Sequence, residues 1–320
     1  MSLEIKPYGP DEEGAWDRFC GLSPNATLLH TRRFLSYHGD RFTDRSLLIL
    51  RDGELAGVLP AAELPSDHAT VASHPGATYG GIVHQGQLRG AAMIDALSAV
   101  ARYYASQGYQ RLQYKPVPHI YCRRPSQDDL YALFRLDAAR VRTDLSCAID
   151  LMDRGDISKR RLRSRKKAAA AVTLSADSGL LAPLWHVLAG NLARKHDAWP
   201  VHSLEELALL HSRFPEHIQV RCALVDGQVE AGVVFFNAAP AWHAQYIAAS
   251  ERGYDVCALD AVFAASIAEA DQTGARYFDF GTSNEHAGRV LNDGLYRFKS
   301  EFGGSGVAHD YYEIELAGHG

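Results

Sequence analysis

The chain of 320 residues lacks a dense cysteine pattern and long apolar runs, and each lack excludes a class of protein. Its five cysteines are scattered without a C-x-x-C pair, which indicates reduced thiols rather than a disulfide framework or a zinc site. No apolar run approaches the roughly 18 residues of a membrane-spanning helix. The N-terminal residues have neither the basic nor the apolar region of a signal peptide. We therefore expect a cytoplasmic protein with no membrane span.

The sequence also lacks the short signatures of several enzyme classes. Its 15 histidines are dispersed, with no H-E-x-x-H pattern, and we expect no catalytic metal. It contains no G-x-S-x-G elbow, Walker loop or clear G-x-G-x-x-G turn, so hydrolase, NTPase and dinucleotide-binding functions have no support. The formal net charge of -5 argues against a generally basic nucleic-acid-binding protein, although it is compatible with a local basic patch.

What the sequence does contain is an internal repeat. Residues 47–59, LLILRDGELAGVL, and residues 222–236, CALVDGQVEAGVVFF, each consist of an apolar run, an Asp-Gly pair and a second apolar run. Asp-Gly between strand-like runs predicts a β-hairpin, because both turn positions favour a positive φ. The sequence therefore predicts equivalent hairpins in its two halves.

A second, longer correspondence follows each hairpin. Residues 93–115, MIDALSAVARYYASQGYQRLQYK, align with residues 258–281, ALDAVFAASIAEADQTGARYFDFG. Each copy predicts a helix, a glycine at the helix C-terminus (Gly108 or Gly274) and an alternating strand. The fold class that follows is mixed α/β, built as a tandem duplication of one unit, with an N-terminal unit at 1–150 and a C-terminal unit at 151–320.

The second half carries additional elements. Residues 156–174 predict a basic helix that leads into a strand, and residues 180–196 predict a helix with an apolar stripe. The stripe consists of Leu181, Trp185, Leu188 and Leu192. Ser203 and Glu206 have the spacing of a capping box, which predicts a helix through about Phe214.

This order of elements resembles the GNAT acyltransferase fold, and two such units in tandem resemble the Fem-related, BioF2-like double-GNAT proteins. The resemblance is most specific in residues 195–210, KHDAWPVHSLEELALL, residues 244–253, AQYIAASERG, and residues 278–304, FDFGTSNEHAGRVLNDGLYRFKSEFGG. It implies transfer of an acyl or aminoacyl group to an amine. The donor would be acyl-CoA or an aminoacyl-tRNA, and the acceptor a cell-envelope or sugar-nucleotide precursor. The chain has no long charged insertion forming a helical arm, so tRNA is the less favoured donor.

The resemblance also implies where a co-substrate would bind. GNAT proteins bind the CoA pyrophosphate with a [QR]-x-x-G-x-[GA] loop at a helix start, and QLRGAA at 87–92 fits this pattern through Gln87, Gly90 and Ala92. We expect acyl-CoA as a co-substrate and no tightly bound cofactor. A plain glycine-containing turn is the alternative, and the counterpart in the second half, ERGYDVCA, is degenerate.

A cationic run predicts a site for a phosphorylated partner. Residues 159–167 contain seven lysines and arginines and no acidic residue. Arg163, Arg165 and Lys166 would bind the phosphates of a substrate or of a tRNA end. A solvated helix face is the structural alternative.

Three residues are candidates for the base that accepts the amine proton. His243 lies on the alternating strand WHAQYIAAS, Glu230 follows the second Asp-Gly turn, and Asp279 lies on the strand FDFG. Gln245 and Tyr246, on the same strand as His243, would orient the acceptor. A buried core pair on this strand and an exposed strand glutamate are the structural alternatives.

The segment F-K-x-x-F-G at the end of the repeat resembles an aromatic-Lys-x-x-aromatic-Gly segment of Fem-type enzymes. Carried over, Lys299 would contact the donor carbonyl or its phosphate, with Phe298 beside it. Gly281 ends the strand where a Cβ would obstruct a ligand or a neighbouring backbone, and Asn284 and Glu285 follow in a loop that would contact substrate. A surface lysine is the alternative for Lys299.

These observations lead to one functional hypothesis and two alternatives. We expect an N-acyltransferase that moves an acyl group from acyl-CoA to an amine, with the chemistry in the second unit and no covalent enzyme intermediate. The first alternative is an aminoacyl-tRNA-dependent Fem-type peptidyltransferase. The second is a ligand-binding protein that keeps the fold without catalysis. The sequence names neither the acyl group nor the oligomeric state.

Overall fold

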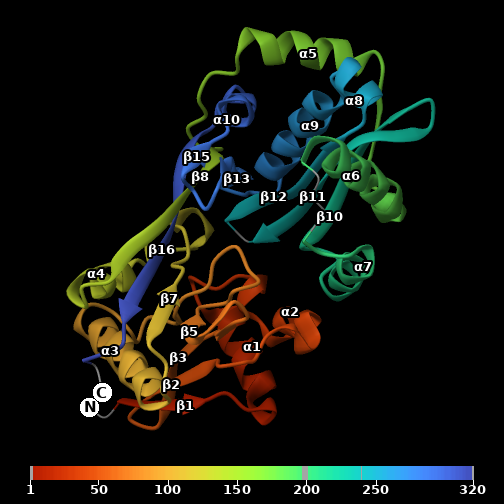
Figure 1. Ribbon diagram of the computed structural model, residues 1–320. Helices are drawn as coiled ribbons and strands as arrows, with labels where there is room; N and C mark the ends of the chain where they lie inside the picture. Colours follow the sequence, from red (N-terminus) through yellow and green to blue (C-terminus); the bar gives the residue numbers. More distant parts are fainter. Residues whose placement is uncertain (1–2, 197–200, 239, 319–320) are drawn as a thin grey trace. The chain divides into compact units, whose positions relative to one another are not determined.

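A computed structural model describes residues 3–196, 201–238 and 240–318 (Figure 1). The chain divides into two compact units. The first contains Met1–Leu145, Glu285–Val290 and Ala308–Gly320, and the second contains Ser146–Asn284 and Leu291–Val307. The sequence suggested a division at residue 150 with everything beyond it in the second unit. In the structure, residues 308–320 belong to the first unit, because the last strand, β16, pairs with β7 of that unit.

The first unit contains two sheets. One has the strand order β1-β2-β3-β6, and the other contains β4-β5-β7-β16 followed by the first part of β8. The strands are β1 (Leu3–Pro7), β2 (Leu47–Arg51), β3 (Glu54–Leu59), β4 (Ala62–Leu64), β5 (Asp67–Ala72), β6 (Val83–His84), β7 (Arg111–Tyr114), β8 (Ala139–Asp150) and β16 (Ser305–Glu315). The helices are α1 (Glu13–Leu22), α2 (Arg32–Leu35), α3 (Ala91–Ser106) and α4 (Asp128–Arg135).

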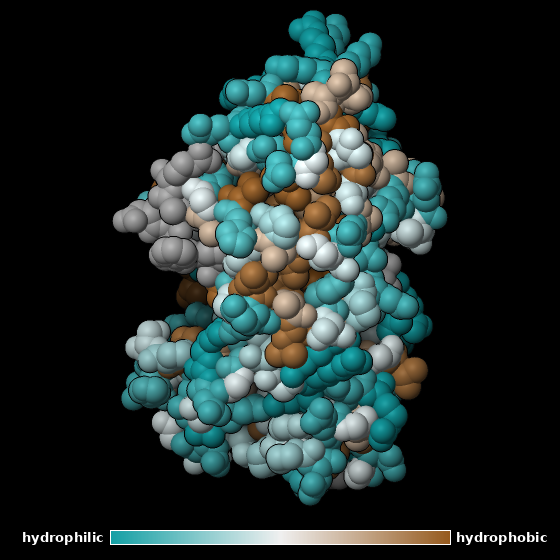
Figure 2. All heavy atoms as spheres, turned by 90° about the vertical axis from the view of Figure 1, so that its right-hand side faces the viewer, coloured by the Kyte–Doolittle hydropathy of each residue, from teal (hydrophilic) through white to brown (hydrophobic). Residues whose placement is uncertain are grey.

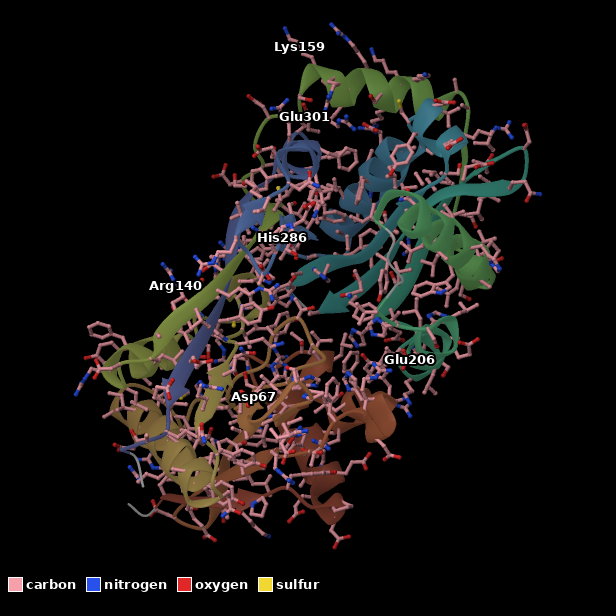
Figure 3. The ribbon with its side chains drawn as sticks, in the orientation of Figure 1. Asp67, Arg140, Lys159, Glu206, His286 and Glu301 are labelled. Carbon is pink, nitrogen blue, oxygen red and sulfur yellow. The ribbon has the colours of Figure 1, made fainter. Side chains whose placement is uncertain are left out.

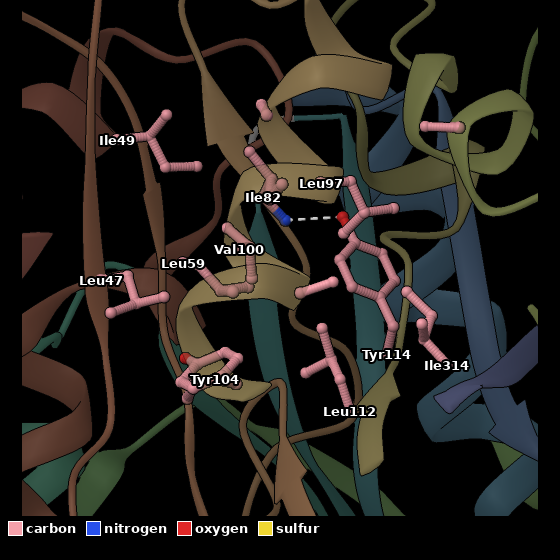
Figure 4. Packing of buried hydrophobic residues seen from close by; sticks show 14 of the residues in the cluster. Leu47, Ile49, Leu59, Ile82, Leu97, Val100, Tyr104, Leu112, Tyr114 and Ile314 are labelled. Atoms are coloured by element: carbon pink, nitrogen blue, oxygen red, sulfur yellow. Dashed lines mark hydrogen bonds between the residues drawn. The ribbon is translucent and has the colours of Figure 1, made fainter. Parts of the chain in front are cut away.

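The core of the first unit lies between α3 and the strands. Leu97, Val100 and Tyr104 form one face of α3 and are fully buried, as the helical spacing predicts. Figure 4 shows them packed beside residues of the surrounding strands, including Leu112 of β7 and Ile314 of β16. Burial of these apolar side chains is the main source of stability for this unit.

The second unit has one main sheet, ordered β8-β13-β12-β11-β10-β9. Its strands beyond β8 are β9 (Thr173–Ser175), β10 (Ile218–Val225), β11 (Gln228–Ala238), β12 (Ala241–Ala249) and β13 (Tyr277–Thr282), with the short hairpin strands β14 (Asn284–Glu285) and β15 (Val290–Leu291). Its helices are α5 (Lys159–Ala169), α6 (Leu181–His196), α7 (Leu204–Arg213), α8 (Glu251–Asp255), α9 (Ala258–Gln272) and α10 (Asp293–Ser300). Phe263 of α9 and Phe278 of β13 are fully buried in the core that α9 forms with the sheet.

The predicted duplication is confirmed. The turn pairs Asp52-Gly53 and Asp226-Gly227 both have positive φ, 51° and 85° in the first and 49° and 78° in the second. Each of the two hairpins, β2–β3 and β10–β11, also contains a register shift close to its turn. Gly108 and Gly274 follow α3 and α9 with φ of 88° and 79°, the left-handed conformation of a helix C-terminal glycine.

The additional elements of the second half also form as the sequence predicts. Helix α5 leads into β9, and Ser203 and Glu206 form both hydrogen bonds of the capping box of α7, at 3.1 and 2.8 Å. Leu181, Trp185 and Leu188 are buried on α6. The side chain of Leu192 and residues 197–200 of the segment 195–210 lie outside the described residues. Among the helices described, none is long and apolar enough to cross a membrane.

Candidate active site

The candidate site lies where two parallel strands of the second unit separate. Strands β12 and β13 pair at three positions only, Ala241 with Tyr277, Trp242 with Phe278 and His243 with Asp279. Beyond this point β12 continues to Ala249 and β13 to Thr282, and no further pair joins the described residues of the two strands. The last pair, His243 and Asp279, therefore lies at the point of separation. Beyond it the backbone N–H and C=O groups of β12 and β13 no longer hydrogen-bond to each other.

His243 and Asp279 form a hydrogen-bonded pair at this point. The Nδ1 atom of His243 lies 2.6 Å from Oδ2 of Asp279. Asp279 is completely buried, whereas the side chain of His243 is 12% exposed. Because a carboxylate accepts the Nδ1 proton, this bond favours the tautomer in which Nε2 of His243 carries the lone pair.

Two further donors hold the Asp279 carboxylate. Its other oxygen, Oδ1, accepts hydrogen bonds from the hydroxyl of Ser146 and, at 3.1 Å, from the backbone N–H of Gly281. A buried carboxylate is stable only when such bonds replace its hydration. Ser146 was not predicted from the sequence, because it lies on β8, 133 residues from Asp279, and only the β8–β13 pairing brings the two together.

Lys299 is buried beneath the end of β13. It is 3% exposed, and its ammonium donates to the carbonyl oxygens of Gly281 at 2.9 Å and Thr282 at 2.6 Å. Burial lowers the pKa of Lys299 to about 8, and the Asp279 carboxylate opposes this shift. Since an ammonium has three N–H groups, one remains beyond these two bonds. Lys299 is therefore no surface lysine, and it connects α10 to the strand that carries Asp279.

The residues around Lys299 form an aromatic cluster. Phe302 is 4% exposed, and its ring lies 5.4 Å from that of Phe298 and 5.4 Å from that of Phe280. Phe298 and Phe302 thus pack into the core of the second unit. Burial beside this core is the main cause of the lowered pKa of Lys299.

Gln245 and Tyr246 occupy an irregular part of β12. Val234 pairs with Tyr246 and Phe235 with Ala244, so Gln245 is an extra residue in a bulge. The bulge interrupts the side-chain alternation along β12 that the sequence WHAQYIAAS predicts. Tyr246 hydrogen-bonds to Nδ1 of His202. Burial raises the pKa of the Tyr246 hydroxyl to about 12, so this group remains protonated.

Glu230 lies away from the His243–Asp279 pair. On β11, His243 is opposite Phe236, whereas Glu230 accepts a hydrogen bond from the hydroxyl of Ser250 beyond the other end of β12. Six residues of strand separate Glu230 from Phe236, about 20 Å at roughly 3.3 Å per residue. Glu230 and His243 therefore cannot act on the same proton, and the position of Glu230 favours a structural role at the start of α8.

Gly281 is required for its backbone conformation rather than for space. Its φ is 76°, and an added Cβ would lie 3.4 Å from Ala244 O and from Cε1 of His243, which is ordinary contact. The expected obstruction of a neighbouring backbone is therefore wrong, and the left-handed φ requires a glycine. Asn284 and Glu285 form β14 of the short hairpin that follows β13 rather than an irregular loop.

A family model matches the part of the chain that contains the His243–Asp279 pair. Residues 154–300 match the family model described as an acetyltransferase (GNAT) domain. The second unit has the GNAT fold. No curated protein sequence is significantly similar to this chain.

Solved structures with the same architecture extend over nearly the whole chain. The crystal structure of FemX is similar at a TM-score of 0.70 and 12% identity, covering 98% of this chain and 97% of that one. The structure of L-PGS from Bacillus licheniformis is similar at a TM-score of 0.62 and 13% identity, covering 97% and 93%. A tandem GNAT protein from the clavulanic acid biosynthesis pathway gives 0.54 at 11% identity, covering 98% and 99%. At these identities the likeness is one of fold.

The first GNAT-like unit binds its own carboxylate at the loop expected to bind CoA. Gly90 is the N-cap of α3, but its N–H donates to Oδ1 of Asp128 at 2.8 Å. The backbone carbonyl of Gln87 accepts from Arg51, and Ala92 lies in the first turn of the helix. An anionic ligand at this helix N-terminus would therefore have to displace Asp128.

In the first unit, side-chain hydrogen bonds link the chain segments before and after α3. In the first unit β6 pairs with β3 and β7 pairs with β5. The hydroxyl of Tyr114 accepts from the N–H of Ile82 at 2.7 Å (Figure 4). The same hydroxyl donates to Asp129 at 3.0 Å. Tyr114 of β7 is thus bonded to the segment that leads into β6.

In the second unit, the residues that precede α9 do not form a glycine-rich loop. Residues 251–255 form the short helix α8, and Cys257 precedes α9 in a left-handed conformation, with φ of 59°. In the first turn of α9, Asp260 accepts two hydrogen bonds of 2.9 Å from Arg161. The degenerate sequence of this loop thus corresponds to a distinct local structure.

The predicted cationic run forms α5, and its members have different environments. Arg161 is buried and bonded to Asp260 and to Glu301, whereas Arg163, Arg165 and Lys166 are exposed. Figure 3 shows Lys159 directed outward from α5 and Glu301 beneath it. The end of the second unit that carries α5 is uppermost in Figures 1 and 2 and is strongly hydrophilic in Figure 2.

A metal site is not found in the part of the chain that the structure describes. No group of three or more histidine, cysteine or acidic side chains has the arrangement of a ligand set among those residues. His243, Asp279, Ser146 and Lys299 are the residues that the structure brings together at the candidate site.

Proposed function

We propose that the protein is an N-acyltransferase that moves an acyl group from acyl-CoA to an amine at the separation of β12 and β13. The observation that carries the proposal is the His243–Asp279 pair, with its 2.6 Å hydrogen bond, at the last paired position of the two strands. Diverging strands leave backbone N–H and C=O groups that a bound amide-containing chain can satisfy. The GNAT fold of this unit is compatible with such a donor.

In the proposed reaction the acceptor amine attacks the carbonyl carbon of the thioester. The new C–N bond forms, the carbonyl electrons move to oxygen, and they return as the C–S bond breaks. His243 Nε2 accepts the proton lost by the amine, and the departing thiolate takes a proton in turn. Asp279 keeps the imidazole oriented and stabilises its charged form, as a buried carboxylate does for a catalytic histidine.

Lys299 is the proposed source of positive charge for the tetrahedral intermediate. Its pKa of about 8 leaves it mostly protonated at neutral pH, and two of its N–H groups are used by Gly281 and Thr282. It acts on the oxyanion through the remaining N–H or through the field it produces at the end of β13. A fixed cation in a water-poor site contributes strongly to such stabilisation.

The test measures free thiol released from a panel of acyl-CoA thioesters in the presence of amines, sugar nucleotides among them. His243→Gln should lower kcat by about 10²–10⁴, the usual contribution of a general base. Asp279→Asn should also lower kcat, because an amide favours the wrong histidine tautomer. His186→Gln is the matched control, since His186 is exposed on α6. Turnover that survives His243→Gln within a few-fold would exclude His243 as the base.

A second candidate function, transfer from an aminoacyl-tRNA, is supported by α5. The exposed cations Arg163, Arg165 and Lys166 lie on a helix that Arg161 and Glu301 fasten to α10, the helix that carries Lys299. The same cations would also suit the diphosphate of a sugar-nucleotide acceptor. The chemistry changes only in the leaving group, an ester oxygen in place of a thiol.

Reversing these three cations to glutamate distinguishes the roles of α5. If α5 binds phosphates, KM for the phosphorylated substrate should rise and its dependence on salt should become shallower, with kcat little changed. Transfer of radiolabelled amino acid from charged tRNA, in place of thiol release, would identify the second candidate. An unchanged KM at low salt would leave α5 as a solubilising helix face.

A further inference from the structure

The first unit contains a small cavity unrelated to the strand separation of the second. Its volume is about 110 Å³, and it lies beside the 3-10 helix Ser36–Arg41 and the loop that follows β5. Leu35, Phe42 and Ala62 supply apolar walls, and His38 and His74 supply polar groups. A cavity of this volume accommodates a molecule of a few non-hydrogen atoms or several waters.

His74 lines this cavity without a hydrogen-bond partner in the described structure. It is 5% exposed, and neither Nδ1 nor Nε2 has a partner. A buried polar group left without a hydrogen bond destabilises the fold, so such groups require an explanation. A ligand that supplies the missing hydrogen bond is one.

The backbone holds His74 in an unusual conformation. Its φ is 63°, uncommon for a residue other than glycine. Gly80 packs tightly against the same loop, because a Cβ added there would lie 2.5 Å from Ser73 O and 3.2 Å from Cβ of His74. The loop is thus fixed so that the imidazole remains at the cavity wall.

Two basic side chains lie near His74. Arg32 lines the cavity, and the ammonium of buried Lys115 donates to the carbonyl of Ala77. Burial lowers the pKa of Lys115 to about 7 and holds the pKa of His74 well below its ordinary value, so the His74 imidazole is neutral at neutral pH. The carboxylate that lines the cavity, Asp44, is bonded to Arg32. The guanidinium of Arg32 at the cavity wall attracts an anion to the same place.

We propose that this cavity binds a short-chain carboxylate, whose oxygen accepts a hydrogen bond from His74 while its hydrocarbon part packs against Leu35, Phe42 and Ala62. Both halves of the ligand have a complement on the cavity wall. The volume suits a chain of a few carbons, and the guanidinium of Arg32 at the wall favours the carboxylate over its amide. The proposal is independent of acyl transfer in the second unit.

The experiment is a calorimetric titration of the full chain with sodium butyrate, with butyramide as the neutral isostere. We expect saturable binding of butyrate and at least 10-fold weaker binding of butyramide. His74→Leu should weaken butyrate binding by about 10- to 100-fold, the value of a hydrogen bond to a charged group. His74→Gln, which retains an amide donor, should recover part of it.

A second variant and a wild-type measurement keep the test decisive if changes at His74 impair folding. Ala62→Leu fills the cavity and leaves His74 in place, and it should abolish binding. In the ¹⁵N-histidine-labelled wild type, one imidazole signal should shift along the same saturation curve. Absence of saturable binding, equal affinity for butyramide, or full affinity in Ala62→Leu would each overturn the proposal.

Discussion

Single residues decide the chemistry of this protein, and the sequence identified some of them but not their partners. The resemblance placed Lys299 at the donor, with a surface lysine as the alternative, and Lys299 is 3% exposed. Its hydrogen bonds to Gly281 and Thr282 depend on how α10 packs at the end of β13. The support that Ser146 gives Asp279 depends on the β8–β13 pairing, across 133 residues. Local patterns carry no information on such contacts. The catalytic roles of Lys299, His243 and Asp279 stay predictions.

The first prediction concerns the charge of Lys299. We expect Lys299→Met to lower kcat by about 10²–10³, as loss of one oxyanion donor does, and Lys299→Arg to recover part of the loss because arginine keeps the charge. Since the pKa of Lys299 is about 8, wild-type kcat should fall as pH rises through 8. The arginine variant should lack this decline, because arginine stays protonated. A rise in kcat through pH 8 in the wild type would instead assign Lys299 the role of base.

The same residue predicts a pH dependence of stability. The pKa of Lys299 is about 8 when folded and near 10.5 ordinarily, so between these values the unfolded chain binds more protons. The free energy of unfolding contributed by Lys299 therefore rises with pH across this window. Chemical denaturation at pH 7.5 and pH 10 should show the wild type gaining stability relative to Lys299→Met. An equal change in both proteins would contradict the assigned pKa.

At the scale of elements, most helices and strands follow from local sequence, and their irregularities do not. The Asp-Gly turns, the C-terminal glycines and the capping box of α7 are local signals, and each formed as predicted. The bulge at Gln245 and the division of β6 and β7 between two sheets reflect packing between strands. The basic run of α5 reads as seven equivalent cations, and only the tertiary structure distinguishes buried Arg161 from its exposed neighbours.

Arg161 predicts how α5 is attached. Its guanidinium bonds to Asp260 and Glu301 and lies 4.8 Å from the centre of the Phe298 ring. Arg161→Met leaves two carboxylates without their buried cation and should lower the free energy of unfolding by about 3–5 kcal/mol. Arg163→Met, on the exposed face of the same helix, should change it by less than about 0.5 kcal/mol. Urea denaturation measures both, and equal effects would show that Arg161 is not the anchor.

Gly108 and Gly274, the equivalent glycines of the two units, allow the duplication to be tested through the free energy of unfolding. Gly108 and Gly274 have positive φ, and an added Cβ would meet nothing within 4 Å at either position. Alanine at each should therefore cost only the left-handed strain, about 1–2 kcal/mol, and similar amounts in the two units. Gly190→Ala, within α6, should instead stabilise by about 0.5–1 kcal/mol. A cost at one of the paired glycines only would argue against equivalent helix ends.

At the scale of the whole molecule, the duplication was visible in the sequence and the path of the chain was not. Aligned hairpins, helices and glycines indicated two units, and the fold confirms them. The return of residues 308–320 to the first unit was not predicted, because a strand carries no local mark of the neighbour with which it pairs. Strand β16 pairs antiparallel with β7, Tyr312 with Tyr114 and Ile314 with Leu112.

The pairing of β16 with β7 predicts that residues 308–316 stabilise the first unit. Ile314 and Leu316 are 1% and 2% exposed and belong to the core that also contains Leu97 and Val100. Ending the chain after Val307 removes β16 from β7, so backbone groups of β7 lose their partners and apolar surface of α3 becomes exposed. Hydrogen exchange should then accelerate in α3 and β7 of the first unit. Ile314→Ala should produce the same pattern more mildly, costing about 2–5 kcal/mol.

A matched truncation separates this effect from mere shortening. Removing residues 317–320 leaves every paired residue of β16 in place and should not alter exchange in the first unit. If ending the chain after Val307 left exchange in α3 and β7 unchanged, the core of the first unit would be complete without β16, and residues 1–150 would suffice for a folded unit. If exchange accelerates as expected, no cut near residue 150 yields two independent domains. The first unit then acquires its final strand only after the residues of the second unit have been synthesised.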